Sequence, residues 1–298
     1  MLAESRRIGA LVETGLKDKV VIVTGATANI GRGIALAFAA EGARVVVSGR
    51  DRQAGELVAG LARERGASAA LWCRADVTVE DDVNALAATT MTEFGQIDVL
   101  VNNVGGNSGV MPFAQTTSKQ WREDLEINLM SMFYGTRAAL PHMLERGSGR
   151  IINIGSTAGL IGDRLLAVYS AAKGAVHAFT KVLALEVGEA GITVNAIAPY
   201  DTRSEDPHSD MSSGSRIHPE TGVFALARAA DPAAIESIKR RTVLVRQQAR
   251  PHEIGAAAVY LASDQAAFIT GHVLRVNGGV GLASGPAPLD RQPRSGAG

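Results

Sequence analysis

The sequence predicts an α/β fold built on a parallel, doubly wound sheet, and three observations support this prediction. Short apolar, β-branched runs alternate with helical patterns along most of the chain. The first run, V-V-I-V-T at 20–24, passes directly into a glycine-containing turn at 24–31 and then into a helical pattern. The runs are continuously apolar, as expected for strands buried on both faces of a parallel sheet. Repeated strand–helix units imply right-handed crossovers, with helices on both faces.

The remaining elements follow the same alternation. After the first strand, further strands are expected at 43–51, 67–74, 97–101, 150–154, 191–199 and 272–279. Helices are expected at 52–65, 79–94, 118–146, from the stretch after Ser156 to about residue 188, and at 250–263. Asp51 is the expected N-cap of the second helix, and the proline at 251 is typical of a helix start. The sequence therefore predicts about seven strands.

One domain is predicted from residue 18 to residue 282. Residues 1–17 precede it as an arm or extra helix, or alternatively as a loose extension. Residues 201–247 break the alternation, and so long a loop in a compact domain is usually a lid or disordered. We expect an enlarged substrate lid there, with a helix from about Asp231. Residues 283–298 are rich in Pro, Gly, Ser and Arg, which predicts a disordered tail.

The composition excludes several function classes. The 298 residues carry 30 basic and 30 acidic side chains, so no nucleic-acid or polyanion partner is indicated. The single cysteine, Cys73, excludes an intrachain disulfide. No apolar run approaches the length of about 20 residues that spans a bilayer, and residues 1–17 lack a signal-peptide core. A cytoplasmic protein is predicted.

The reactive side chains are expected between Ser156 and Lys173. Tyr169 and Lys173 are four residues apart, so on a helix they share one face. The ammonium group should favour the phenolate and lower the tyrosine pKa from its usual value of about 10. Tyr169 could then donate or accept a proton, while Ser156, behind an apolar strand, holds a carbonyl or alkoxide oxygen. Such a pair arises by chance in many chains, so the interpretation depends on the motifs upstream.

Those upstream motifs indicate a dinucleotide site. Gly25 permits a sharp turn, and Gly31 lets the backbone approach a pyrophosphate at the helix N-terminus. The second strand ends in Gly49 and Arg50, where a carboxylate would bind the ribose 2′-hydroxyl of NAD. A guanidinium there can instead pair with a 2′-phosphate, which favours NADP(H) over NAD(H). The alternative is that Arg50 is a solvated charge at a strand end.

Polar residues also follow the later strands, where ligands bind in such sheets. Asp76, Asn102 and Gly105 are expected to contact the cofactor, or else to form turns. Asn128 lies among apolar residues inside the 118–146 helix, where its amide needs partners. It is either a satisfied structural amide or the sign of a helix distortion whose carbonyl holds a water near Lys173. A proline at 141 is expected to kink the same helix.

Taken in order, these motifs resemble those of the classical short-chain dehydrogenase/reductase family, and within it the 3-oxoacyl-carrier-protein reductase-like members. The match spans roughly residues 17–282. The matching motifs are T-G-x-x-x-x-x-G at 24–31, A-D-V at 75–77, N-N-x-G at 102–105, Asn128, Ser156, Y-x-x-x-K at 169–173 and the closing I-T-G and V-N-G-G runs. The resemblance implies a Rossmann-type sheet of order 3-2-1-4-5-6-7, hydride transfer between NADP(H) and a ketone or secondary alcohol, and a homotetramer or homodimer.

The resemblance also implies roles for individual residues. Tyr169 exchanges the proton, Ser156 holds the substrate oxygen, Lys173 lowers the tyrosine pKa and binds the nicotinamide ribose, and Asn128 supports a water-linked relay. No metal is implied. The cofactor-binding residues are expected to be Gly25, Thr27, Asn29, Ile30, Gly31, Arg50, Asp76, Val77, Asn102, Gly105, Tyr169, Lys173, Pro199, Tyr200 and Thr202.

The chain departs from the family pattern at two places. Asn29 replaces a glycine of the phosphate loop, and asparagine tolerates left-handed backbone better than most residues. Tyr200 replaces the glycine that usually follows Pro199. Its ring is expected to narrow the pocket on the nicotinamide side or to stack on the substrate. Thr202 or Ser204 would then replace the family's carboxamide-binding threonine.

The substrate is predicted only as a class, a small ketone or secondary alcohol. Candidate pocket residues are Asn107, Ser108, Leu160, Ile161, Asp163 and Arg164, with His208 and His218 in the lid region but without metal-ligand spacing. Two alternatives remain open at this point. One is the same chemistry with NAD(H). The other is a catalytically idle dinucleotide-binding subunit or sensor, which the intact set of four catalytic residues disfavours.

Overall fold

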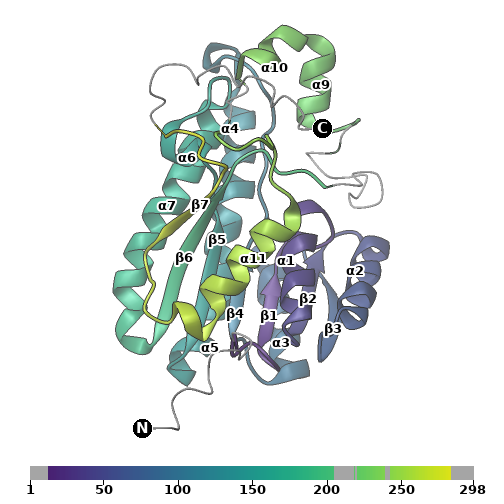
Figure 1. Ribbon diagram of the computed structural model, residues 1–298, viewed down its shortest axis with the longest axis vertical. Coiled ribbons are helices and arrows are strands. Elements are labelled where there is room, and N and C mark those ends of the chain that lie inside the picture. The colour runs from purple at the N-terminus through teal and green to yellow at the C-terminus, as the bar shows by residue number, and fades with distance from the viewer. Residues whose placement is uncertain (1–12, 205–217, 219, 239–241, 283–298) are drawn as a thin grey trace, which may run out of the picture.

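The structure is a computed structural model that describes residues 13–204, 218, 220–238 and 242–282 (Figure 1). The predictions for residues 1–12, for the parts of the lid at 205–217, 219 and 239–241, including His208, and for the tail at 283–298 lie outside the described residues.

Seven parallel strands form one sheet in the order β3-β2-β1-β4-β5-β6-β7, as predicted. Their bounds are β1 Val20–Val23, β2 Arg44–Gly49, β3 Ala69–Arg74, β4 Val99–Asn102, β5 Gly149–Ile154, β6 Ile192–Pro199 and β7 Val273–Val276. The chain reverses its direction of travel across the sheet between β1 and β4. In such sheets this switch point is where a crevice opens for a ligand.

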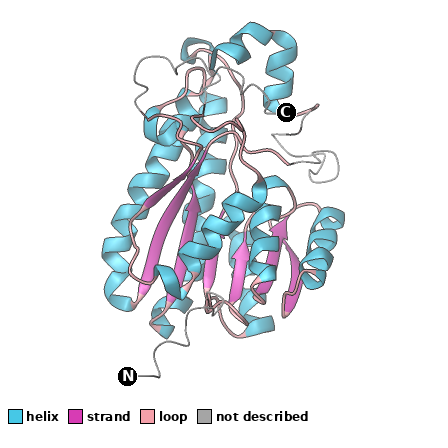
Figure 2. Ribbon diagram, viewed as in Figure 1, coloured by secondary structure: helices cyan, strands magenta, loops and turns pink. Residues whose placement is uncertain are grey.

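Helices cover both faces of the sheet, so the molecule has three layers (Figure 2). The α-helices are α1 Asn29–Ala40, α2 Arg52–Glu64, α3 Glu80–Phe94, α4 Ser118–Leu125, α5 Ser131–Arg146, α6 Ala158–Ile161, α7 Ala167–Val187, α9 Val223–Ala230, α10 Pro232–Ile238 and α11 Pro251–Ala262. Shorter 3-10 turns are η1 Phe113–Gln115, η3 Gly188–Ala190 and η4 Asp264–Ala266.

The core consists of two apolar clusters, one on each face of the sheet. In β1, Val21 and Val23 join the cluster that contains α1, α2 and α11. Val20 and Ile22 point the other way and join residues of α3, α5 and α7. Because successive side chains of a strand alternate between faces, a strand buried on both sides must be apolar throughout. This burial explains the continuous apolar runs of the sequence.

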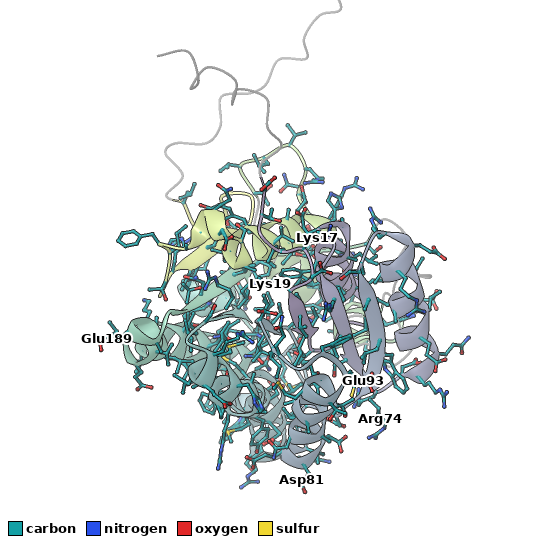
Figure 3. All side chains as sticks on the ribbon, turned by 90° about the horizontal axis from the view of Figure 1, so that it is seen from below. Lys17, Lys19, Arg74, Asp81, Glu93 and Glu189 are labelled. Atoms are coloured by element: carbon teal, nitrogen blue, oxygen red, sulfur yellow. The ribbon has the colours of Figure 1, made fainter. Side chains whose placement is uncertain are left out.

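Helix starts follow the predicted capping signals. The Asp51 carboxylate accepts a hydrogen bond of 3.0 Å from the backbone N–H of Ala54 and caps α2. Pro251 opens α11, where its missing N–H costs nothing. Figure 3 shows the molecule from below, at the end of the sheet opposite to the strand carboxyl ends, with Lys19 labelled. Asp98 pairs with Lys19 at 3.7 Å and with Arg146 at 3.4 Å. These ion pairs brace the amino ends of the strands.

The predicted helix over 118–146 is interrupted, as the position of Asn128 suggested. A π-helical turn, η2 Glu126–Met130, separates α4 from α5, and the N–H of Ser131 bonds the carbonyl of Glu126. Such π-bulges are frequent at functional sites. The helix α5 continues through Pro141 to Arg146.

The described part of the predicted lid region contains two helices where one was expected. The first, α9, begins at Val223, ahead of the predicted start near Asp231, and α10 follows directly. Asp231 itself lies between them, outside both helices, because its backbone has a non-helical conformation with φ −147°. No helix in the described part of the chain combines the length and apolar character needed to cross a membrane.

Candidate active site

A pocket of about 950 Å³ lies at the carboxyl ends of the strands, over the switch point of the sheet. Nine of the predicted cofactor-binding residues line it: Gly25, Thr27, Asn29, Ile30, Gly31, Arg50, Asp76, Val77 and Gly105. The other predicted residues, Asn102, Tyr169, Lys173, Pro199, Tyr200 and Thr202, do not line this pocket. The structure thus brings the dinucleotide motif together in one cavity and places the reactive residues beside it.

The phosphate loop has the shape that an anion site needs. Gly25 adopts φ +61°, and a side chain at Gly31 would clash with the carbonyl oxygen of Gly25, only 2.1 Å from its Cβ position. Asn29 adopts φ +40° in place of the family's glycine. Ala28 caps α1 without a side-chain hydrogen bond, so the first N–H groups of the helix point toward the pocket end.

Arg50 marks the far end of the pocket. Its side chain is exposed, and its Nη1 lies 3.7 Å from Oδ2 of Asp76. Burial acts to raise the pKa of Asp76, but hydrogen bonds from Thr78 and the charges of Arg50 and Arg74 outweigh it and lower that pKa. No carboxylate stands at position 49, where Gly49 packs against Thr27. This end of the pocket can therefore hold a negative group beside Arg50.

The reactive residues meet between β5 and α7. The chain turns from Ile154 through Ser156 into α6. Helix α6 crosses α7 in backbone contact, which glycine permits at position 159, because a Cβ there would lie only 2.5 Å from the backbone of Lys173. The Lys173 ammonium is buried, donates to the carbonyl of Ile154 at 2.8 Å and lies 6.0 Å from the centre of the Tyr169 ring. Lys173 and Tyr169 thus share one face of α7, as their spacing predicted.

The Ser156 side chain lies beside the Tyr169 hydroxyl. Burial raises the pKa of Tyr169, the hydrogen bond from Ser156 opposes this, and the charges of Asp163 and Asp124 add to the increase. Lys173 is not among the groups that shift the Tyr169 pKa in this structure, so its role in lowering that pKa stays a prediction. Burial also lowers the pKa of Lys173, to about 8, and its ammonium is directed at Ile154 rather than at the phenol.

Asn128 combines the two interpretations that the sequence left open. Its Nδ2 donates to the carbonyls of Gly106 at 2.5 Å and Asp124 at 2.8 Å, and its Oδ1 accepts from the N–H of Gly106 at 3.0 Å. The amide is therefore satisfied, and it also lies in the π-helical turn. A side chain at Gly105 would come within 2.8 Å of both Asn128 Oδ1 and Lys173 Nζ, so only glycine fits between them.

Asn102 does not line the pocket and is held by structural hydrogen bonds, whereas the next residue, Asn103, lines the pocket. The Asn102 amide is buried and donates to Thr136 at 3.1 Å and to Asn153 at 2.9 Å. Asn103 instead lines the pocket and holds the phosphate loop by donating to the carbonyls of Thr24 and Gly25. Strand alternation is the signal that could have separated the two, since the adjacent residue points the other way.

His177 is a site residue that the sequence analysis missed. Its Nε2 lies 3.5 Å from the N–H of Ser156, and a side chain at Gly155 would meet the imidazole at 2.2 Å. Its pKa is lowered to about 4, chiefly by burial, with the charges of Lys173 and Lys181 adding to the decrease and a backbone hydrogen bond with Gly159 partly offsetting it. Its position one turn beyond Lys173 on the same helix face was the available signal.

The segment after β6 closes the other side of the site. The carbonyl of Pro199 accepts from Thr157 at 2.8 Å, and Thr202 Oγ1 donates to the carbonyl of Tyr200 at 3.0 Å. Thr202 and Ser204 are both buried. Across the site, the N–H of Met111 bonds the carbonyl of Leu165 at 3.1 Å.

The remaining substrate-side residues are more dispersed. Asn107 is buried, with its amide bound to the carbonyl of Gly109 at 3.0 Å, and Ser108 donates its N–H to Asp124 at 2.7 Å. Asp124 is a second residue that the sequence analysis missed. His218 accepts from the N–H groups of Glu220 and Thr221, a turn contact.

Comparison with known proteins agrees with this geometry. A family model described as short chain dehydrogenase matches residues 19–211. An L-fucose dehydrogenase of Oryctolagus cuniculus is 40% identical over 90% of this chain and 87% of the relative. A 3beta-hydroxysteroid dehydrogenase of Eggerthella lenta is 36% identical over 91% of this chain and 96% of the relative. A 3-oxoacyl-[acyl-carrier-protein] reductase of Vibrio cholerae is 34% identical over 89% and 98%.

The sheet order, the glycine loop and the Ser-Tyr-Lys grouping all match what the sequence motifs implied. Relatives of this similarity, covering nine-tenths of the chain, settle the class of protein and leave the idle-subunit alternative without support. The chain belongs to the short-chain dehydrogenase family, whose NAD(P)-dependent oxidoreductases interconvert alcohols and carbonyl compounds.

Proposed function

We propose that the protein transfers a hydride between NADP(H) and a small ketone or secondary alcohol, with Tyr169 as the proton donor or acceptor. The observation that carries this proposal is the grouping of Ser156 and Lys173 about Tyr169. The Ser156 side chain lies beside the phenol, and Lys173 follows Tyr169 by one helical turn, with its Nζ 6.0 Å from the ring centre.

Each residue of the group has a distinct role in the proposal. Tyr169 gives its proton to the oxygen of a ketone, or takes one from an alcohol, and Ser156 holds that oxygen in place. Lys173, fixed by the Ile154 carbonyl, holds the nicotinamide ribose and supplies positive charge as the phenolate forms. Asn128, in its π-helical turn, supports a proton path toward Lys173. The nicotinamide, when bound, supplies or receives the hydride.

The preference for NADP(H) is based on Arg50. Its guanidinium is exposed at the pocket wall, and its pairing with Asp76 at 3.7 Å is a weak, solvated contact. A 2′-phosphate offers a doubly charged partner with several acceptor oxygens, which a guanidinium binds more strongly. At position 49, Gly49 presents no carboxylate to repel that phosphate.

NAD(H) is the second candidate cofactor, and one observation favours it. Two carboxylates, Asp51 and Asp76, line the same end of the pocket as Arg50. Either could accept a hydrogen bond from a ribose hydroxyl, and both would repel a phosphate. The Asp51 carboxylate already caps α2, which leaves Asp76 as the stronger competitor for Arg50.

Equilibrium binding of NADPH and NADH, followed by cofactor fluorescence, separates the two candidates. For wild type we expect tighter binding of NADPH. Arg50→Ala should weaken NADPH about tenfold or more and leave NADH nearly unchanged, since a charged hydrogen-bond partner is lost only for the phosphate. Arg52→Ala is the matched control, because Arg52 pairs with Glu56 on the surface. Preference for NADH, or no effect of Arg50→Ala, would overturn the assignment.

The named relatives act on a sugar, a steroid and an acyl-carrier-protein ketone, so the shared chemistry is the secondary alcohol or ketone. For this chain we propose a small-molecule substrate held between the Met111–Leu165 contact and Tyr200.

We also propose a homotetramer or homodimer. The outer face of α7 exposes Val182 and Leu185, the latter at 84%, which supports a covered face. Analytical ultracentrifugation tests the assembly: a monomer at micromolar concentration would exclude it.

A further inference from the structure

Asn29 adds a side chain to the phosphate loop at a position where glycine would supply backbone alone. It adopts φ +40°, a left-handed conformation that costs an L-residue free energy and that glycine adopts without strain. Retaining a side chain in such a position indicates that the side chain has a task of its own.

The Asn29 amide reaches across the molecule. Its Nδ2 donates to the backbone carbonyl of Thr202 at 3.3 Å, over a sequence separation of 173 residues. Asn29 and Thr202 are both buried, at 4% and 8% exposure. A carbonyl can only accept, so this contact sets the amide with its nitrogen toward Thr202. The Asn29 Oδ1 is buried and makes no hydrogen bond within the described structure.

Thr202 lies where the two ends of the lid region meet. It forms an isolated parallel bridge with Ala249, in which the N–H of Arg203 donates to Ala249 and the N–H of Ala249 donates to Asp201, both at 2.9 Å. Gln248 adds a side-chain hydrogen bond to Asp201 at 2.9 Å. We call this joined pair of segments, 201–203 and 248–249, the lid base.

We propose that Asn29 is a positioning residue that fastens the lid base to the phosphate loop. A ligand that binds the phosphate loop then also lowers the mobility of the lid base, although the ligand need not contact the lid base. Coupling of this kind is reciprocal, so a less mobile lid base raises the affinity of the loop for its ligand. The identity of that ligand as a dinucleotide rests on the proposed function; the link between the two segments does not.

Amide hydrogen exchange of the unliganded protein, followed by mass spectrometry, tests the link itself. Asn29→Gly removes the side chain and keeps the left-handed backbone, as in the family pattern. It should speed exchange of the lid-base amides about twofold to tenfold, the effect of one hydrogen bond. Asn29→Asp, which keeps the shape but loses the donor, should do the same. Unchanged lid-base exchange in both variants would overturn the proposal, whatever the cofactor.

A second experiment tests whether ligand binding at the phosphate loop changes the mobility of the lid base. ADP-ribose and 2′-phospho-ADP-ribose carry the pyrophosphate but no nicotinamide, so they reach the loop without reaching the nicotinamide side. In wild type, whichever of them binds should slow exchange at both the loop and the lid base. In Asn29→Gly it should slow exchange at the loop alone, with affinity lowered about twofold to tenfold.

Arg50→Ala is the matched control, because it weakens 2′-phospho-ADP-ribose while leaving the Asn29–Thr202 contact in place. At a saturating concentration of 2′-phospho-ADP-ribose, amide exchange in Arg50→Ala should slow at both the phosphate loop and the lid base, as in wild type. Protection of the lid base in Asn29→Gly equal to that in wild type would overturn the proposal, as would loop protection without lid-base protection in wild type. Binding of neither compound would contradict the proposed function, and the unliganded exchange would still decide the link.

Discussion

The buried ammonium group of Lys173 donates a hydrogen bond of 2.8 Å to the carbonyl oxygen of Ile154, the last residue of β5. This contact ties the central helix of the site, α7, to the carboxyl end of the sheet. It holds a charge in a place where burial lowers the lysine pKa to about 8. The site therefore contains a charge that costs the folded state stability.

Lys173→Met should reveal that cost through its pH dependence. Between about pH 8 and pH 10.5 the unfolded lysine holds a proton that the folded one has lost, so wild-type stability rises with pH over this window. The stability of wild type relative to Lys173→Met should increase by about 2 kcal/mol between pH 7.5 and pH 9.5. Urea unfolding of both proteins at each pH measures this difference, in which other titrating groups cancel. A difference independent of pH, or one that falls, would contradict the lowered pKa.

His177→Leu should lower kcat by about tenfold to 100-fold with little change in cofactor affinity, because a small displacement of a reacting group is costly. The imidazole holds the Gly155–Ser156 backbone through its contact with the Ser156 N–H at 3.5 Å. His177→Gln, which keeps an acceptor, should recover part of the loss. In a Ser156→Ala background the His177→Leu effect should largely vanish.

Thr180→Val is the control for the His177 series. Thr180 lies on the same buried side of α7, but its hydroxyl accepts a hydrogen bond of 3.0 Å from Asn153 of β5 and donates one of 2.8 Å to the carbonyl of Val176. A similar loss of kcat in Thr180→Val, with full additivity in the Ser156→Ala background, would mean that His177 acts only through helix packing.

Asp163→Asn should shift the pH profile of ketone reduction. The Asp163 charge raises the pKa of Tyr169, so removing the charge lowers that pKa. Reduction needs the protonated phenol, and its rate falls as the pH rises through the tyrosine pKa. The alkaline fall in kcat/KM should therefore move to lower pH in the variant. Glu189→Gln, far from the site, should leave the profile in place; a move to higher pH in Asp163→Asn would contradict the electrostatic account.

Gly105→Ala should destabilise the fold by about 1–3 kcal/mol, the usual cost of overpacking. The added methyl group would lie 2.8 Å from both Asn128 Oδ1 and Lys173 Nζ. Gly188→Ala is the matched control, since no other part of the described chain comes within 4 Å of its Cβ position and its φ is −60°. Thermal or urea unfolding compares the two variants, and equal stabilities would show that the contact around Gly105 relaxes freely.

The sequence predicted the strands and most of the pocket because both depend on local patterns, whereas the order of the strands was implied by the resemblance to a known family. A strand buried on both faces has to be apolar throughout, and the turn that binds phosphate has to contain Gly25 and Gly31. These requirements act within a few residues, so periodicity and glycine spacing reveal them.

What the sequence could not predict depends on contacts between distant segments. The raised pKa of Tyr169 follows from burial and from Asp163 and Asp124, whose proximity only the fold creates. The roles of His177 and of the Asn29–Thr202 contact likewise depend on which elements pack together. The helix expected from about Asp231 corresponds to α10, which begins at Pro232, but α9 was missed because its eight residues are too few for a clear periodic pattern.

Turnover tests the central claim most directly. NADPH oxidation, followed by the absorbance of the reduced nicotinamide, would be measured with a panel of cyclic, aliphatic and β-keto ester ketones for wild type, Tyr169→Phe and Ser156→Ala. The account predicts that wild type reduces at least one of these ketones and that Tyr169→Phe loses at least about 100-fold in kcat, while still binding NADPH. Reduction by Tyr169→Phe at the wild-type rate would contradict the assignment of Tyr169 as the proton donor.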